Sequence, residues 1–168
     1  GGVTVDERGS TITVRTGAAT VELAKSELVL RGHRFEVESG GTAYRGLPET
    51  WTIEEPGPVK AVLRVDGFRA TALDVRLGDD RLVRFRARLT FWRNDGSVRV
   101  SVTFQNRGPI CWEADGCTRA PDVELSGARL GTALLPPGGL YVFGPGVEKT
   151  WDVVVGAGAA ATLLETRY

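Results

Sequence analysis

Side chains that often build functional sites are scarce in this chain of 168 residues. It has no methionine, two cysteines and one histidine, His33. A zinc ion takes about four ligands, so one histidine and two cysteines remote from it do not predict a metal site. The missing methionine, even at position 1, indicates a processed mature chain or an excised domain. The chain as given begins with no signal peptide.

Net charge and long apolar runs are also lacking. The 21 basic residues balance the 21 acidic ones, so no overall field attracts nucleic acid or an anionic membrane. The longest apolar runs, near Val153–Val155 and Ala159–Leu164, are far shorter than the roughly 20 residues of a membrane-spanning helix. We therefore expect no nucleic-acid partner and no membrane span.

Cys111 and Cys117, the only cysteines, stand six residues apart in a loop. One interpretation is a disulfide in a secreted, extracellular protein, and the other is two reduced thiols in a cytosolic chain.

Strand patterns separated by glycine and proline turns fill the rest of the chain, and no window shows a helical period. Strands of this number and spacing predict an all-β fold, an antiparallel β-sandwich or distorted β-barrel, as a single domain over residues 1–168. The expected strands are Val3–Asp6, Thr11–Arg15, Ala19–Leu23, Leu28–Arg31, His33–Glu38, Trp51–Glu55, Val59–Val65, Thr71–Leu77, Val123–Leu125, Arg129–Leu135, Leu140–Phe143, Trp151–Val155 and Thr162–Thr166.

The best-specified segment is Leu82–Asn106. Apolar and polar residues alternate on both sides of Asn94–Ser97, and this period of two predicts a long β-hairpin with one buried face. A two-residue turn at Asp95–Gly96, or a four-residue loop, would pair Phe91 with Val100. The expected buried face comprises Val83, Phe85, Ala87, Leu89, Phe91, Val98, Val100, Val102 and Phe104.

Several strand-and-turn phrases are typical of one family when they are taken in order. They are Ser10–Gly17 with Ala19–Leu23, then Trp51–Gly67, the hairpin Arg84–Phe104, and Gly146–Asp152. Together they span residues 3–155 and resemble the RIFT-related β-barrel domain of exo-rhamnogalacturonan-lyase-like proteins, which are large secreted polysaccharide-degrading enzymes. Family members are longer, with an α-helical toroid and a further β domain that this chain lacks. The resemblance therefore implies a β-barrel fold and carries no catalytic residue, cofactor or lyase activity to this chain.

The outward face of the hairpin is the first candidate site. Arg84, Arg86, Arg88 and Arg99 lie on it, and Trp92 would stand across from Arg99 in the expected register. Such a cationic and aromatic platform could bind an acidic glycan, because arginine forms forks with carboxylates and tryptophan offers a stacking face. The alternative is a solvated sheet face whose arginines pair with acidic residues of neighbouring strands, such as Asp74 or Glu54.

The loop between the cysteines is the second candidate. Trp112 stands there near Glu113 and Asp115, and Asp122 follows. These groups could form a sugar-stacking tip or a calcium site, although the spacing matches no EF-hand. The alternative is a polar disulfide loop that binds nothing.

No sequence motif predicts catalysis. His33 has no nucleophile at a recognisable spacing, and no Gly-x-Ser-x-Gly elbow occurs. We therefore expect a non-catalytic extracellular β module of a carbohydrate-active protein, which binds an acidic polysaccharide or packs against a catalytic domain. The alternative is a structural subunit of an extracellular filament or surface layer, assembled by β-strand addition between copies.

Overall fold

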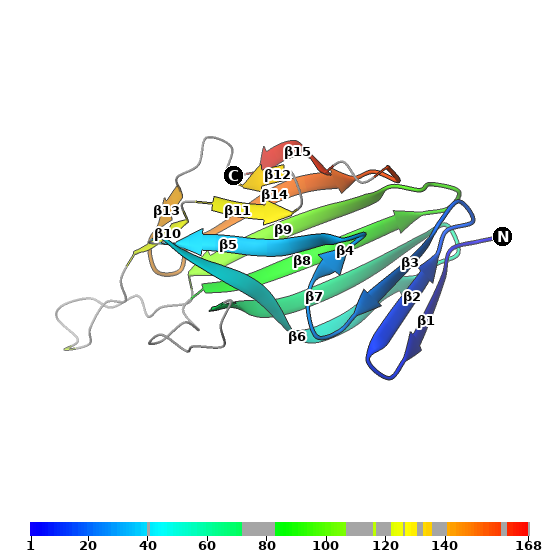
Figure 1. Cartoon of the computed structure of the whole chain (residues 1–168), viewed down its shortest axis with the longest axis horizontal. Helices are drawn as coiled ribbons and strands as arrows, with labels where there is room; N and C mark the ends of the chain where they lie inside the picture. Colours follow the sequence, from blue (N-terminus) through cyan, green and yellow to red (C-terminus); the bar gives the residue numbers. More distant parts are fainter. Residues whose placement is uncertain are drawn as a thin grey trace.

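The computed structural model is all-β, as the sequence predicts, and its strands pair in antiparallel sheets (Figure 1). It describes residues 1–39, 41–71, 83–106, 116, 122–125, 127–130, 133–135, 141–158 and 161–167. Within these ranges, no helix is long and apolar enough to cross a membrane.

The largest sheet has ten strands and curls into a half-barrel. In chain order they are β4 (Val29–Leu30), β5 (His33–Ser39), β6 (Thr42–Pro56), β7 (Lys60–Thr71), β8 (Val83–Trp92), β9 (Val98–Asn106), β11 (Gly127–Leu130), β12 (Ala133–Leu135), β14 (Glu148–Val155) and β15 (Ala161–Arg167). Their order in the sheet is β12-β11-β5-β6-β7-β8-β9-β14-β15, and β4 pairs with β5. The two end strands, β12 and β15, approach each other.

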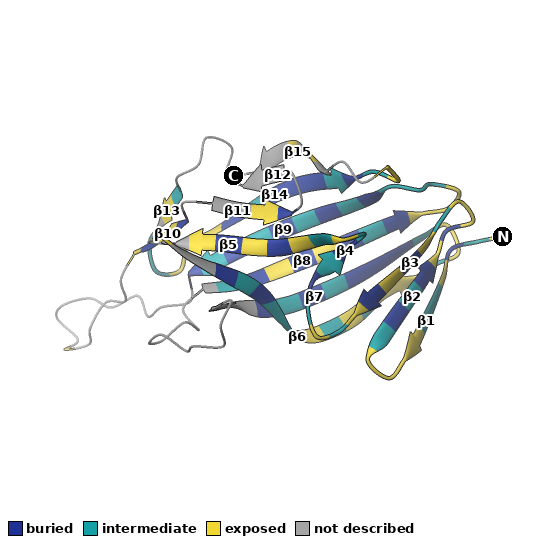
Figure 2. Cartoon of the chain, in the orientation of Figure 1, coloured by how far each residue is buried: buried dark blue, intermediate teal, exposed yellow. Residues whose placement is uncertain are grey.

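The inner face of this sheet holds the core. Phe35 on β5 lies against Phe85 on β8 and Phe104 on β9, with ring centroids 5.0 and 5.7 Å apart. Contacts between strands that are distant in the sheet show that the sheet folds over onto itself. Buried residues alternate with exposed or half-buried ones along β8 and with half-buried ones along β9 (Figure 2), so the expected buried face of the hairpin is confirmed from Phe85 to Phe104.

A smaller sheet of β1 (Thr4–Arg8), β2 (Thr11–Arg15) and β3 (Thr20–Ala24) contributes to the same core. The buried side chains of β2 and β3 alternate with half-buried or exposed ones, as expected for strands with one apolar face. The N-terminus is tied to the large sheet, because the Val3 amide donates to the Pro58 carbonyl at 2.7 Å. A two-stranded sheet of β10 (Val123–Leu125) and β13 (Tyr141–Phe143) completes the described strands.

The expected register of the hairpin is wrong by two residues. Phe91 pairs with Val98 rather than Val100, so residues 92–97, which are Trp92 at the end of β8 and the loop after it, lie between the last paired residues. The loop is longer because it contacts the smaller sheet: the Asn94 amide donates to the Thr16 carbonyl at 2.7 Å, and Thr16 Oγ1 donates to the Asp95 carbonyl at 2.7 Å. The number of residues between the last paired residues is still even, so both faces of the hairpin are as expected.

Two segments expected to be irregular belong to long strands. Much of the expected loop at 39–48 forms the first half of β6, and the expected turn at Asp66–Gly67 lies inside β7. The register of β6 against β7 shifts between Pro48 and Thr50 and again between Ile53 and Glu55. These β-bulges leave Glu49 and Glu54 as the extra residues of β6.

Some expectations change or fall outside the described residues. The expected strand Arg129–Leu135 is two antiparallel strands, β11 and β12. Beyond Thr71, which ends β7, the expected strand Thr71–Leu77 lies outside the described residues. The same is true of Cys111, Trp112 and Cys117, so the disulfide and the loop site stay predictions.

Candidate functional site

Three arginines follow one another on the outer face of β8, and each contacts a carboxylate. Arg84 Nη1 lies 3.3 Å from Glu49, and Arg86 Nε lies 2.9 Å from Asp66. Arg88 donates through Nε and Nη2 to the two oxygens of Glu54, at 2.9 and 3.2 Å. The expected alternative, a sheet face of paired arginines, therefore holds for all three, with Glu54 as one of the partners. Asp74, the other expected partner, lies outside the described residues.

The β-bulges of β6 explain how these pairs form. Glu49 and Glu54 are the extra residues of the two bulges, and β7 lies between β6 and β8 in the sheet. Both glutamates therefore reach across β7 to arginines on β8, while Asp66 on β7 takes the arginine between them. A bulge re-aims the side chain of its extra residue. Here the two bulges direct Glu49 and Glu54 toward the arginines on β8.

Arg64 on β7 joins two of these pairs into one network. Its Nε lies 2.7 Å from Asp66, and its Nη1 lies 3.5 Å from Glu54. The hydrogen bond from Arg88 lowers the pKa of Glu54 below its ordinary value. Burial raises the pKa of Asp66, but hydrogen bonds from Arg86 and Arg64 outweigh it, so this pKa is also lowered. The hydrogen bond to Asp66 raises the pKa of Arg64. Both carboxylates therefore stay charged at neutral pH.

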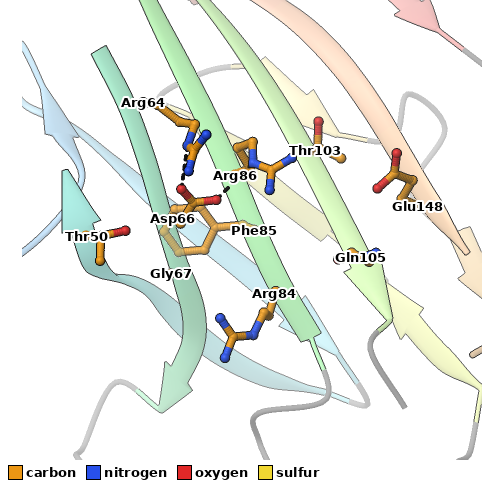
Figure 3. Close-up of a pocket in the computed structure, with 10 residues that line it drawn as sticks. All are labelled: Thr50, Arg64, Asp66, Gly67, Arg84, Phe85, Arg86, Thr103, Gln105 and Glu148. Atoms are coloured by element: carbon orange, nitrogen blue, oxygen red, sulfur yellow. Dashed lines mark hydrogen bonds and ion pairs between the residues drawn. The ribbon is translucent and has the colours of Figure 1, made fainter. Parts of the chain in front are cut away.

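A polar hollow of about 220 Å³ lies within this network (Figure 3). Strands β6, β7, β8, β9 and β14 supply its lining, which comprises Thr50, Arg64, Asp66, Gly67, Arg84, Phe85, Arg86, Thr103, Gln105 and Glu148. Gly67 lacks a side chain where β7 passes close to Leu47 on β6 and to the buried ring of Phe85. A Cβ at this position would lie 2.2 Å from the Leu47 carbonyl oxygen and 2.7 Å from the Phe85 ring.

Arg86 is the central cation of the hollow. Asp66 holds its Nε, and its Cα partner on β9 is Thr103 (Figure 3). Among the described residues, its two terminal nitrogens donate no hydrogen bond. Arg88 differs, because Glu54 binds both its Nε and Nη2, and Arg88 does not line the hollow. The hollow therefore contains one arginine that is held at its Nε and has donors left for a ligand.

The other expected site residues lie elsewhere. Arg99 pairs with Asp152 at 2.8 Å and stands across from Thr90, so the expected juxtaposition with Trp92 is wrong. Trp92 instead lies at the far end of β8, with Lys60 as its Cα partner on β7. The structure thus brings Arg84 and Arg86 together in the hollow and separates them from Trp92.

Sequence reasoning missed several residues of the hollow. The period of two in β9 already placed Thr103 and Gln105 on the same face as the arginines. Thr50, Arg64 and Asp66 carried a weaker signal, because Asp66–Gly67 is a common turn pair and hid the continuation of β7.

The face is balanced in charge, unlike the expected cationic platform. Among the described residues, six basic groups share it with six carboxylates: Lys60, Arg64, Arg84, Arg86, Arg88 and Arg99 with Glu49, Glu54, Glu55, Asp66, Glu148 and Asp152. A ligand on this face therefore meets fixed, paired groups rather than a broad positive field.

Comparison of the chain with protein-family models, curated proteins and solved structures finds no match.

Proposed function

We propose that this chain is an extracellular, non-catalytic β module that binds an acidic polysaccharide in the polar hollow. One observation carries the proposal: Arg86 is anchored at its Nε by Asp66 while its terminal N–H groups remain available beside the hollow. A guanidinium held in this way loses little side-chain entropy when a ligand binds. Its two terminal nitrogens suit the two oxygens of a sugar carboxylate.

The charges that line the hollow support an acidic ligand. Three guanidinium groups and two carboxylates belong to the lining, which leaves one net positive charge. One uronate carboxylate would cancel that charge. Thr50, Thr103 and Gln105 add hydroxyl and amide groups, which donate and accept the hydrogen bonds that sugar hydroxyls form.

The carbohydrate class comes from the resemblance of residues 3–155 to a β-barrel domain of secreted polysaccharide-degrading proteins. A secreted location also suits a disulfide between Cys111 and Cys117. Mass spectrometry of the chain before and after reduction tests that bond, and two free thiols without reductant would contradict it.

The experiment on the hollow compares two arginine variants of the same strand. Arg86→Ala and Arg88→Ala each remove one positive charge, and each leaves a carboxylate that still contacts Arg64. Of these two arginines, only Arg86 lines the hollow. Calorimetric titration with oligogalacturonides should therefore show at least about a tenfold loss of affinity for Arg86→Ala and near wild-type affinity for Arg88→Ala.

Two results would overturn the proposal. Equal losses in both variants would mean that only overall charge matters. If the wild-type chain binds no acidic or neutral glycan, the proposed function is wrong.

Assembly by strand addition is a second proposal, favoured by the position of β1. Among the described strands, β1 pairs with β2 alone, so its other edge is open. An open edge offers unpaired backbone groups to another chain. Sedimentation velocity over a wide concentration range tests this, and a monomer at every concentration would contradict it.

A further inference from the structure

Among the described residues, Trp92 is the most exposed aromatic ring on the outer face that carries the hollow. It ends β8, on the same face as Arg84, Arg86 and Arg88, and 41% of its surface is exposed. Because side chains on one face of a strand recur every second residue, Trp92 stands three positions beyond Arg86 on that face. An aromatic ring exposed on a polar sheet face offers an apolar surface to a ligand.

Lys60 lies over the ring of Trp92. Lys60 Nζ lies 5.7 Å from the ring centroid and 3.0 Å from the Glu55 carboxylate. A cation over one face of the ring leaves the opposite face for stacking.

The distance between Trp92 and the hollow sets the size of a ligand that contacts both. The six residues from Arg86 to Trp92 span roughly 20 Å of strand. A monosaccharide or disaccharide is too short for this span, whereas a longer oligosaccharide can cover it. The outward residues between them are Arg88 and Thr90, and the Nε and Nη2 of Arg88 both donate to Glu54.

We propose that Trp92 is a second subsite for the glycan that the hollow binds. The ligand is then an extended polymer that lies along β8, with a uronate carboxylate on Arg86 and the apolar face of a sugar ring on Trp92. This inference rests on the proposed function and adds the ligand's length and direction. Once one end of the glycan has bound, the second contact forms within the same complex, so the two contacts together bind more tightly than either alone.

The test is the length dependence of binding. Wild type, Arg86→Ala, Trp92→Ala and Trp92→Phe are titrated with oligogalacturonides from the disaccharide to the octasaccharide. Trp92→Ala should bind the octasaccharide about tenfold more weakly than wild type and the disaccharide equally well. Trp92→Phe should keep most of the octasaccharide affinity, because phenylalanine retains a stacking face. Arg86→Ala should weaken binding at every length.

A matched control removes other exposed apolar surface. Leu164 on β15 is 54% exposed, and Leu164→Ala should bind every oligomer like wild type. If Trp92→Ala keeps the wild-type length dependence while Arg86→Ala binds weakly, the second subsite is wrong and the hollow stands. If wild type binds no oligomer, the proposed function and this inference both fail.

Discussion

The close approach of Leu47 and Phe85 to Gly67 predicts that Gly67→Ala destabilises the fold. The added Cβ would lie 2.2 Å from the Leu47 carbonyl oxygen and 2.7 Å from two carbons of the Phe85 ring. The nearest of these atoms is backbone on the paired strand β6, so it cannot turn away as a side chain can. Relief of the contact requires β6 and β7 to separate or Phe85 to leave its position against Phe35.

The expected loss is about 2 kcal/mol. Overpacking costs roughly 1–3 kcal/mol, and the contact with a backbone atom places this substitution near 3 kcal/mol. Replacing a glycine returns about 0.4–1 kcal/mol through the unfolded chain. For a chain of this size, each kcal/mol lowers the melting temperature by roughly 2–4 °C. Gly67→Ala should therefore melt about 4–8 °C below wild type when unfolding is followed by calorimetry.

Gly158→Ala is the matched control. A Cβ at Gly158 meets nothing within 4 Å, so this variant should be as stable as wild type, or more stable by up to about 1 kcal/mol. If the two variants melt at the same temperature, the close approach of Leu47 and Phe85 to Gly67 is wrong.

Two further predictions concern stability. The pKa values of Glu54 and Asp66 are lowered below their ordinary values, so their contribution is present above the ordinary pKa values and lost as pH falls through the folded-state pKa values. The free energy of unfolding should therefore decrease in acid, measured by urea unfolding, and Asp66→Asn should flatten this dependence; an unchanged pH profile in that variant would contradict the prediction. Thr16→Val should cost about 1–3 kcal/mol, because buried Thr16 Oγ1 donates to the Asp95 carbonyl at 2.7 Å and accepts from the Ala19 amide at 3.1 Å; urea midpoints equal to those of wild type would refute this.

Local patterns predicted the parts of the fold that local chemistry determines. The alternation of apolar residues from Phe85 to Phe104 placed the core face of the hairpin correctly, because strand periodicity depends only on neighbours in sequence. The register was wrong because the loop after Trp92 is fixed by Thr16, which lies far away in the chain. No pattern in the hairpin itself could reveal that contact.

The candidate site was predictable to a similar extent. The outward position of Arg86 followed from alternation, but the carboxylates that hold the arginines depended on features of the assembled sheet. Glu49 reaches Arg84 only because β6 is bulged at that residue. Gly67 suggested a turn, but it lies inside a strand. Glycine is required there because Leu47 and Phe85 approach its backbone closely.

The contact between Thr16 and the β8–β9 loop has a consequence for the order of folding. Thr16 and Asp95 are 79 residues apart in sequence, whereas β6, β7, β8 and β9 pair with their neighbours along the chain. Contacts so distant in sequence pay a larger loop-closure entropy, so we expect the smaller sheet to join the hairpin late. The Thr16→Val variant tests this, because loss of a late contact speeds unfolding and leaves the folding rate unchanged; slower folding would place the contact in the transition state. On this route the loop reaches its final shape only after the hairpin strands have met.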